Sequence, residues 1–244
     1  MRPLTAAANW EILASAPGPR EVGREGAPMR FADRADAGRR LARALAAYRD
    51  RDPIVLALPR GGVPVAAEIA TALAAPLDVV LARKIGVPSH PELAMGALVD
   101  GDTPVVVRNE AVIRAARVDE RAFEAARIRA LAEAESARRR LVGDRPRAEI
   151  AGRAAIVVDD GVATGATALA ALKALRLMKP KTLTLAVPVA AADSLAALKR
   201  EVDDLVCLEA PEHFGAVSMF YADFRQVEDD EVVALLARFP PAAP

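Results

Sequence analysis

Two adjacent carboxylates and a loop of small residues are the part of this chain best suited to chemistry. Asp159 and Asp160 follow the apolar run AAIVV, and the loop GVATGAT comes directly after them. Gly161 and Gly165 let the backbone turn tightly and expose N–H groups, and the helix expected next presents its positive dipole end, so the loop suits a phosphate. Two carboxylates would repel that phosphate, but they accept hydrogen bonds well from neighbouring hydroxyl groups. A phosphate in the loop and a diol on the aspartates together describe a ribose 5-phosphate.

The loop differs from the common nucleotide-binding motifs. It has no lysine in the G-x-x-x-x-G-K-[ST] pattern, and it does not match G-x-G-x-x-G. Thr164 and Thr167 can add hydroxyl donors, and a loop without lysine fits a terminal phosphate better than a transferred one. The plain alternative is a strand end with solvated acids, which would explain a lone aspartate but not the whole string.

Composition narrows the classes of partner. The 244 residues include 33 Lys and Arg against 33 Asp and Glu, so the net charge is zero and neither nucleic acid nor a membrane surface is expected as a partner. No apolar stretch has the length of a membrane span, and the N-terminal residues lack the clean hydrophobic segment of a signal peptide. The single cysteine, Cys207, cannot form an internal disulfide, which fits a reducing compartment. We expect a cytoplasmic protein.

The hydrophobic pattern predicts an α/β fold. Short continuous apolar runs such as PIVLAL, LDVVLA, AAIVV and LVCLEA alternate with helical stretches. This alternation predicts an open, mostly parallel sheet with helices on both faces. Ligands of such sheets bind beyond the carboxyl ends of the strands. The residues to examine are therefore Arg60, Gly61, Gly62, Arg83, Lys84, and residues 159–167 and 211–221.

Helical patterns and composition divide the chain further. Residues 1–28 are rich in Ala, Pro, Gly and Arg without periodicity and are expected to be a disordered arm, with Met29 as a hypothetical second start of translation. Residues 29–244 then form a single domain. A helix is expected from Asp33, with Arg34 among the arginines placed mostly away from its apolar face. Residues 119–141 predict a long amphipathic helix whose charges form a solvated face rather than a nucleic-acid stripe.

The string IVVDDGVATGAT resembles the signature of type I phosphoribosyltransferases that binds phosphoribosyl diphosphate (PRPP). The resemblance extends from about Phe31, since the order of strands and loops agrees. Taken with ALPRGG, ARKIG and PEHFGAVSMFYADF, the chain is most similar to a poorly characterised branch of this family. The resemblance does not imply a particular base.

The resemblance implies a role for each matching residue. Asp159 and Asp160 would hold the ribose hydroxyls, with Mg²⁺ nearby and held indirectly. Arg83 and Lys84 would act on the departing diphosphate, although taken alone they could be a solvated strand end. The 5-phosphate would contact Ala163, Thr164, Gly165, Ala166 and Thr167, and the diphosphate would contact Arg60, Gly61 and Gly62.

Two further segments match the family's mobile lid and its hood. The stretch IGVPSHPELAMGAL is expected to be a loop that forms the catalytic lid, with His90 and Glu92 as exposed residues or contacts to diphosphate or Mg²⁺. A hood formed by the N-terminal segment and residues of about 208–225 would choose the base. Phe214 and Tyr221 could stack on that base or belong to the hood's own core. Ala163 stands where enzymes that use hypoxanthine or guanine usually carry an acid, which disfavours a 6-oxopurine.

The leading hypothesis is an enzyme that transfers ribose 5-phosphate from PRPP to an unidentified base, with release of diphosphate, in nucleotide salvage. The alternative is a regulator that senses PRPP without turning it over. The basic pair and the lid favour the enzyme, because a sensor has less use for charge at the leaving group. A third possibility is a diphosphokinase that makes PRPP. It is disfavoured because the sequence has no recognisable ATP site. The long helix and the resemblance make a homodimer plausible.

Overall fold

The structure is a computed structural model that describes residues 31–101 and 104–239. The predictions for residues 1–28 and for Met29 lie outside this range. The helices are α1 (Arg34–Ala44), η1 (Ala46–Arg51), α2 (Gly62–Leu73), α3 (Glu110–Ala115), α4 (Glu120–Leu141), α5 (Ala166–Leu177), α6 (Ala192–Leu198), η2 (Val217–Phe220) and α7 (Asp229–Leu236). The strands are β1 (Pro53–Ala57), β2 (Leu77–Val79), β3 (Ala82–Val87), β4 (His90–Val99), β5 (Val105–Arg108), β6 (Ala154–Val158), β7 (Thr182–Val189) and β8 (Asp204–Glu209).

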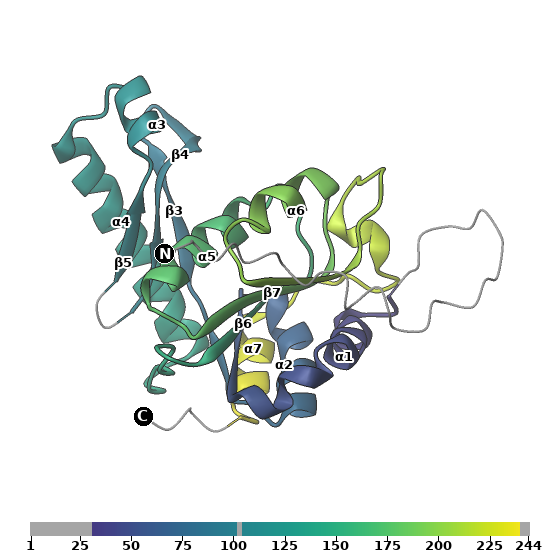
Figure 1. Cartoon of the computed structure of the whole chain (residues 1–244). Coiled ribbons are helices and arrows are strands. Elements are labelled where there is room, and N and C mark those ends of the chain that lie inside the picture. Colours follow the sequence, from purple (N-terminus) through teal and green to yellow (C-terminus); the bar gives the residue numbers. More distant parts are fainter. Residues whose placement is uncertain (1–30, 102–103, 240–244) are drawn as a thin grey trace, which may run out of the picture.

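Five strands form the parallel sheet that the sequence predicts, in the order β2-β1-β6-β7-β8. Every residue of the neighbouring inner strands β1 and β6 is buried, because helices cover both faces. Neighbouring residues point to opposite faces: Ile156 and Val158 join one core cluster, whereas Ala155 and Val157 join the other. Figure 1 shows α5 and α6 on one side of this sheet and α1, α2 and α7 on the other. Because all five strands are parallel, their carboxyl ends lie at the same edge of the sheet.

A second sheet departs from the prediction. The apolar run after residue 76 divides into β2 and β3, which belong to different sheets, and β3, β4 and β5 form an antiparallel sheet. The loop expected for IGVPSHPELAMGAL is wrong, since nearly all of it lies in β3 and β4. Close approach explains why a glycine stands in the hairpin, because a Cβ on Gly86 would lie 2.4 Å from the carbonyl oxygen of Pro91.

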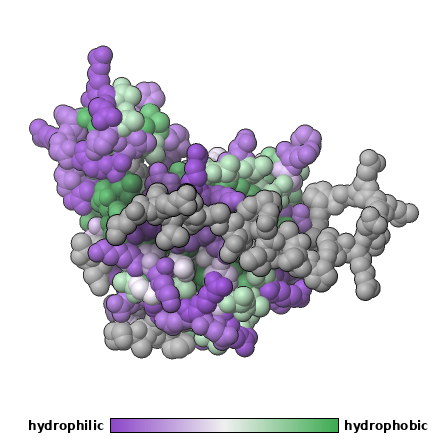
Figure 2. All heavy atoms as spheres, in the orientation of Figure 1, coloured by the Kyte–Doolittle hydropathy of each residue, from purple (hydrophilic) through white to green (hydrophobic). Residues whose placement is uncertain are grey.

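The antiparallel lobe, which we define as β3, β4, β5, α3 and α4, projects from the rest of the fold (Figure 1). Its sheet lies between α4 and α5, since Ile85, Met95 and Leu98 pack with α4 in one core and Val99 packs with α5 in the other. In Figure 2 mostly hydrophilic side chains cover the projecting end of the lobe, and hydrophobic ones show where it meets the rest of the molecule.

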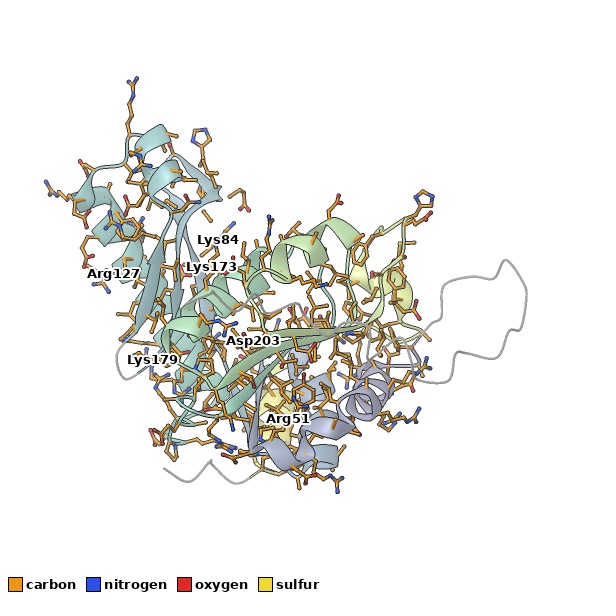
Figure 3. The ribbon with its side chains drawn as sticks, in the orientation of Figure 1. Arg51, Lys84, Arg127, Lys173, Lys179 and Asp203 are labelled. Atoms are coloured by element: carbon orange, nitrogen blue, oxygen red, sulfur yellow. The ribbon has the colours of Figure 1, made fainter. Side chains whose placement is uncertain are left out.

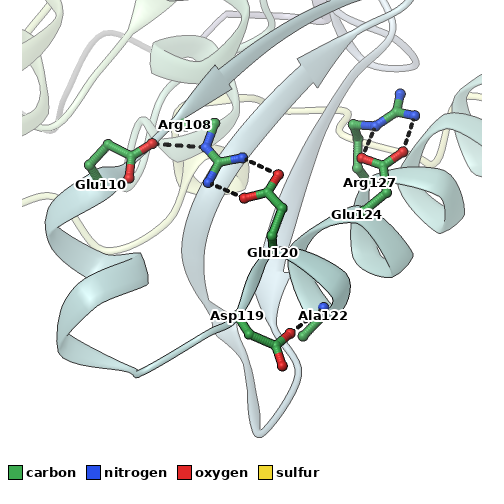
Figure 4. A network of polar contacts seen from close by, with 7 residues as sticks. All are labelled: Arg108, Glu110, Asp119, Glu120, Ala122, Glu124 and Arg127. Carbon is green, nitrogen blue, oxygen red and sulfur yellow. Dashed lines mark hydrogen bonds and ion pairs between the residues drawn. The ribbon is translucent and has the colours of Figure 1, made fainter.

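An arginine at the end of β5 fixes the long helix to the lobe (Figure 4). Arg108 makes two hydrogen bonds to Glu120, of 2.8 and 2.9 Å, and a third of 2.8 Å to Glu110. Its guanidinium also lies 4.1 Å from the centre of the Phe123 ring. The predicted helix of residues 119–141 is confirmed as α4, with Asp119 as its N-cap, 2.7 Å from the amide nitrogen of Ala122.

Two segments far apart in the sequence pair beside the carboxyl edge of the parallel sheet. Phe31 donates its backbone N–H to Phe220 (2.8 Å) and accepts from Ala222 (2.7 Å), and Asp223 donates to Ala32 (2.9 Å). The rings of Phe31, Phe220 and Tyr221 form a small core of their own with Val189 of β7. This pairing places residues 214–225 over the ends of β6 and β7, where the sequence predicts a hood.

Candidate functional site

The acidic pair lies at the end of β6 and faces the loop that follows β1. A Cβ on Gly61 would lie 2.0 Å from Oδ2 of Asp160, and one on Gly62 would lie 2.6 Å from the carbonyl oxygen of Val158. Only glycine allows the two loops to approach this closely. The peptide bond between Pro59 and Arg60 is cis. The structure thus brings PRGG together with DDG at one edge of the sheet.

Arg34 is the residue at this site that the sequence analysis placed wrongly. Its Nε lies 2.7 Å from Oδ2 of Asp160, and its Nη1 donates to the carbonyl oxygen of Arg225 at 2.7 Å. The guanidinium also lies 3.9 Å from the centre of the Phe224 ring. Only 9% of Arg34 is exposed, so it belongs to the buried face of α1. The available signal was its spacing, three residues before Ala37 and seven before Leu41, which repeats on one helix face.

Burial and mutual repulsion dominate the electrostatics of the pair. Burial raises the pKa of Asp159 well above its usual value, and the neighbouring carboxylate of Asp160 raises it further. Burial also raises the pKa of Asp160, but the hydrogen bond and the charge of Arg34 act in the opposite direction. The backbone amide of Asp160 donates to Oδ1 of Asp159 at 2.9 Å. Arg34 therefore favours the charged form that accepts hydrogen bonds from hydroxyl groups.

The predicted phosphate loop lies between β6 and α5 and is held at its base. Val162 forms an isolated parallel bridge with Ala190, and Ser194 Oγ donates to the carbonyl oxygen of Ala163 at 2.6 Å. Gly165 has φ of 72° and is the N-cap of α5, a left-handed conformation that favours glycine. Ala163, Thr164, Ala166 and Thr167 are exposed. The loop thus presents free hydroxyl groups and the first amides of α5 beside the acidic pair.

The predicted basic residues lie within PRGG (Arg60) and on β3 (Arg83 and Lys84). The Nη1 atom of Arg60 is 3.5 Å from Asp229 and 3.6 Å from Glu228, both at the start of α7. Arg83 donates to its neighbouring carbonyl, that of Ala82, at 2.9 Å. Lys84 lies on β3, with Nζ 2.6 Å from Oε2 of Glu92, and in Figure 3 it projects from the antiparallel lobe on the side of the lobe facing the rest of the fold.

His90, which the sequence analysis placed in a lid, lies at the start of β4. Its Nδ1 is 3.0 Å from the hydroxyl oxygen of Ser89, and both residues are exposed. The contact of Glu92 with Lys84 is within the same β3–β4 hairpin. In the part of the chain that the structure describes, neither side chain forms a hydrogen bond or an ion pair with the acidic pair.

The aromatic residues of the hood differ in exposure. Tyr221 is 2% exposed, and its hydroxyl donates to the carbonyl oxygen of Asp160 at 2.6 Å. Phe214 is half-buried and stacks on Phe220 with ring centres 5.6 Å apart. Tyr221 thus supports the acidic pair from the hood's core. A cavity of about 510 Å³ opens beside the acidic pair. It is lined by Arg34, Arg60, Gly61, Asp160, Val217, Phe224, Gln226 and Val227.

The comparison with known families matches this arrangement of loops and sheet. A family model described as the phosphoribosyl transferase domain covers residues 32–225. The chain belongs to this family. The match spans the whole parallel sheet, the antiparallel lobe and the hood, and it includes the PRGG loop and the acidic pair.

Individual relatives agree with the family. A protein of Mycobacterium tuberculosis, named provisionally as a phosphoribosyl transferase, is 46% identical over 208 residues, in two strains. That match covers 85% of this chain, and the chain spans about half (46%) of the relative's length. The crystal structure of TT1426 from Thermus thermophilus is 40% identical, with a TM-score of 0.79 over 87% of this chain and 100% of that one. The chain therefore shares the fold of TT1426 over the matched part.

Within residues 31–101 and 104–239, no helix has both the length and the apolar character needed to cross a membrane. The same residues contain no group of three or more His, Cys, Asp or Glu side chains suited to hold a metal ion.

Proposed function

We propose that this protein transfers ribose 5-phosphate from PRPP to a nitrogenous base and releases diphosphate, in nucleotide salvage. The observation that supports this most is the meeting of two loops, PRGG and residues 159–167, at one sheet edge. Asp159 and Asp160 face Gly61 at a distance that excludes any side chain there, and the loop of Thr164 and Thr167 lies directly beyond them. A diol acceptor, a phosphate cradle and an open backbone approach are the parts that PRPP requires.

In the proposed reaction each part acts on a different region of PRPP. The aspartates accept hydrogen bonds from the 2- and 3-hydroxyls and so fix the ribose. Amides and hydroxyls of residues 163–167 hold the 5-phosphate at the N-terminus of α5. Arg60, Arg83 and Lys84 attract the diphosphate as negative charge develops on it. The cavity beside Phe224 and Val217 receives the base.

The donor set at the edge fits Mg²⁺. This ion is usually held by one or two carboxylates together with substrate phosphates and water, rather than by a complete cage of side chains. Asp159 and Asp160 supply those carboxylates, directly or through water, and their burial makes a nearby cation favourable. When bound, Mg²⁺ would neutralise charge on the diphosphate.

We also keep a cytoplasmic location and a homodimer as parts of the proposal.

The test is diphosphate release from PRPP and Mg²⁺ across a panel of purine, pyrimidine and non-standard bases. The proposal expects release that depends on one base and is lost in Asp159→Asn/Asp160→Asn. The control Asp203→Asn/Asp204→Asn changes two neighbouring aspartates outside the site and should keep the activity. Equal release of diphosphate by both double variants would contradict the proposed site.

A PRPP sensor is the second candidate, favoured by one observation. Two of the cations expected to attract the leaving diphosphate already form ion pairs with acidic side chains. Lys84 pairs with Glu92, and Arg60 pairs with Asp229 and Glu228. PRPP binding that requires the aspartates, together with no release for any base, would favour this reading over the enzyme.

A further inference from the structure

A second hollow lies beside the PRGG loop, separate from the cavity under the hood. Its volume is about 300 Å³, and it shares only Arg60 with the larger cavity. Three arginines line it from three different elements: Arg60 follows β1, Arg83 lies on β3 and Arg140 lies in the last turn of α4. Asp229 is the one acid in its lining.

Asp229 joins two of these arginines. Its Oδ1 lies 3.5 Å from Nη1 of Arg60, and its Oδ2 lies 3.1 Å from Nε of Arg140. The contact to Arg60 is long, and Glu228 shares the same nitrogen at 3.6 Å. These pairs are also partly exposed, since the side chains of Arg60, Asp229 and Arg140 keep 39%, 36% and 58% of their surface. A stronger anion can therefore displace the acid without a large loss.

The charge of the hollow calls for such an anion. The lining brings three positive charges against one negative charge, with Glu228 as a second acid just outside it, and Arg83 uses a backbone carbonyl rather than an acid as its partner. Guanidinium groups that converge from separate elements repel one another unless a counter-ion lies between them. Guanidinium groups bind phosphate oxygens in pairs of parallel hydrogen bonds, which makes a diphosphate a good match for this geometry.

We propose that Arg140 binds the diphosphate of PRPP together with Arg60 and Arg83, and that Asp229 is a counter-ion which the diphosphate displaces. This inference rests on the proposed function. Asp229 keeps Arg60 and Arg140 in place while the hollow is empty. Once diphosphate is bound, the same carboxylate repels it and favours its release.

The chain offers a matched control for each residue. Arg139 lies next to Arg140 at the same helix end and is exposed like it, but it lies outside the hollow. Asp230 lies next to Asp229 in the first turn of α7, where it has a similar interaction with the helix dipole, and it is also exposed. Each pair of variants therefore changes the same charge on the same helix turn.

The experiment measures binding of inorganic diphosphate to the full chain by calorimetry in the presence of Mg²⁺. Arg140→Gln should weaken binding about tenfold, because a charge-assisted hydrogen bond is lost, whereas Arg139→Gln should change it by less than about twofold. Asp229→Asn should tighten binding roughly threefold, and Asp230→Asn should leave it unchanged. Thermal melting of each variant checks its fold, and Arg140→Lys, which keeps the charge, serves if Arg140→Gln does not fold.

The outcomes separate the inference from the proposed function. If PRPP binds in a manner that Asp160→Asn abolishes, but Arg140 and Asp229 variants behave like their controls, the inference is wrong and the function stands. If the wild-type chain binds neither PRPP nor diphosphate, both fail. An Asp229→Asn variant that binds diphosphate more weakly would also overturn the role of Asp229 as a displaced counter-ion.

Discussion

The Nε of Arg34 lies 2.7 Å from Oδ2 of Asp160, so an ion pair joins the first helix of the described chain to the acidic pair after β6. The side chains of both partners are largely buried, at 10% and 14% exposure. A partner left alone in such a place carries an uncompensated charge, which is far more costly than the loss of an exposed pair. Arg34 thus links the hood, through Phe224 and Arg225, to the group expected to hold the ribose.

The first prediction concerns the charge of Asp160. Arg34→Gln should raise the pKa of Asp160 because the opposing charge and hydrogen bond are lost. PRPP affinity should fall about tenfold near neutral pH, and the pH at which binding is half-lost should move upward, since the carboxylate must be charged to accept two hydroxyl donors. Calorimetric titration with PRPP between pH 5 and 9 measures this. Arg43→Gln, an exposed arginine on the same helix, should leave the profile unchanged; equal profiles for both variants would contradict the prediction.

The second prediction concerns stability. Burial and the charge of Asp160 raise the pKa of Asp159, so the folded state binds this proton more tightly than the unfolded state. The free energy of unfolding should therefore fall as pH rises from the ordinary value of 3.8 through the raised one. Asp159→Asn removes this cost, so it should raise the Tm at pH 8 by about 2–4 °C for each kcal/mol gained. The gain should disappear near pH 4; a gain that is constant with pH would point to a cause other than ionisation.

The third prediction concerns the close approach of PRGG to the aspartates. Gly61→Ala would place a methyl group 2.0 Å from Oδ2 of Asp160, so the loops must separate. PRPP affinity should fall about a hundredfold, because a shift of about 1 Å at a binding site has that scale of effect. Gly215→Ala is the control, since its methyl group would meet only the flexible end of Met219. Unchanged PRPP binding by Gly61→Ala would mean that this approach does not shape the site.

The fourth prediction separates support of the site from support of the fold. Tyr221→Phe and Tyr48→Phe each remove one buried hydroxyl group, bonded to Asp160 and Asp204 respectively. Each should lower the free energy of unfolding by about 1 kcal/mol. Only Tyr221→Phe should also weaken PRPP binding, by roughly threefold or more, because only it releases the backbone of the acidic pair. Chemical denaturation and calorimetry together test this, and equal effects on binding would refute it.

The parallel sheet could be predicted from sequence because its signal is local. Each central strand is a short apolar run buried on both faces, and a helix follows it, so the pattern of β1 and β6 leaves few alternatives. The loop after β6 could also be predicted from its own residues. Gly165 is needed for a left-handed turn, and the aspartates follow the strand directly.

The antiparallel lobe could not be predicted in the same way. Residues 88–92 read PSHPE, a composition typical of a loop, yet His90 to Glu92 lie in β4, and His90 pairs with Val87 of β3. The strands owe their burial to α4 and α5, which lie later in the sequence and cover the two faces of the sheet. Strand formation here depends on tertiary packing rather than on local preference.

The partners of the predicted basic residues could not be predicted from the sequence either. Arg60 stands out in PRGG, but nothing in the sequence links it to Asp229, which is 169 residues later. The acids at the start of α7 predict only favourable interactions with the helix dipole. Their second contact, with the loop after β1, depends on how α7 packs against α2 and α4, which the fold alone determines.

The central claim is that the PRGG loop and the loop of residues 159–167 form a PRPP site, and direct binding tests it most simply. Calorimetric titration with PRPP and Mg²⁺ should give saturable binding to the wild-type chain, lost in Asp159→Asn/Asp160→Asn and kept in Asp203→Asn/Asp204→Asn. No binding to the wild-type chain, or equal binding by the two double variants, would contradict the claim.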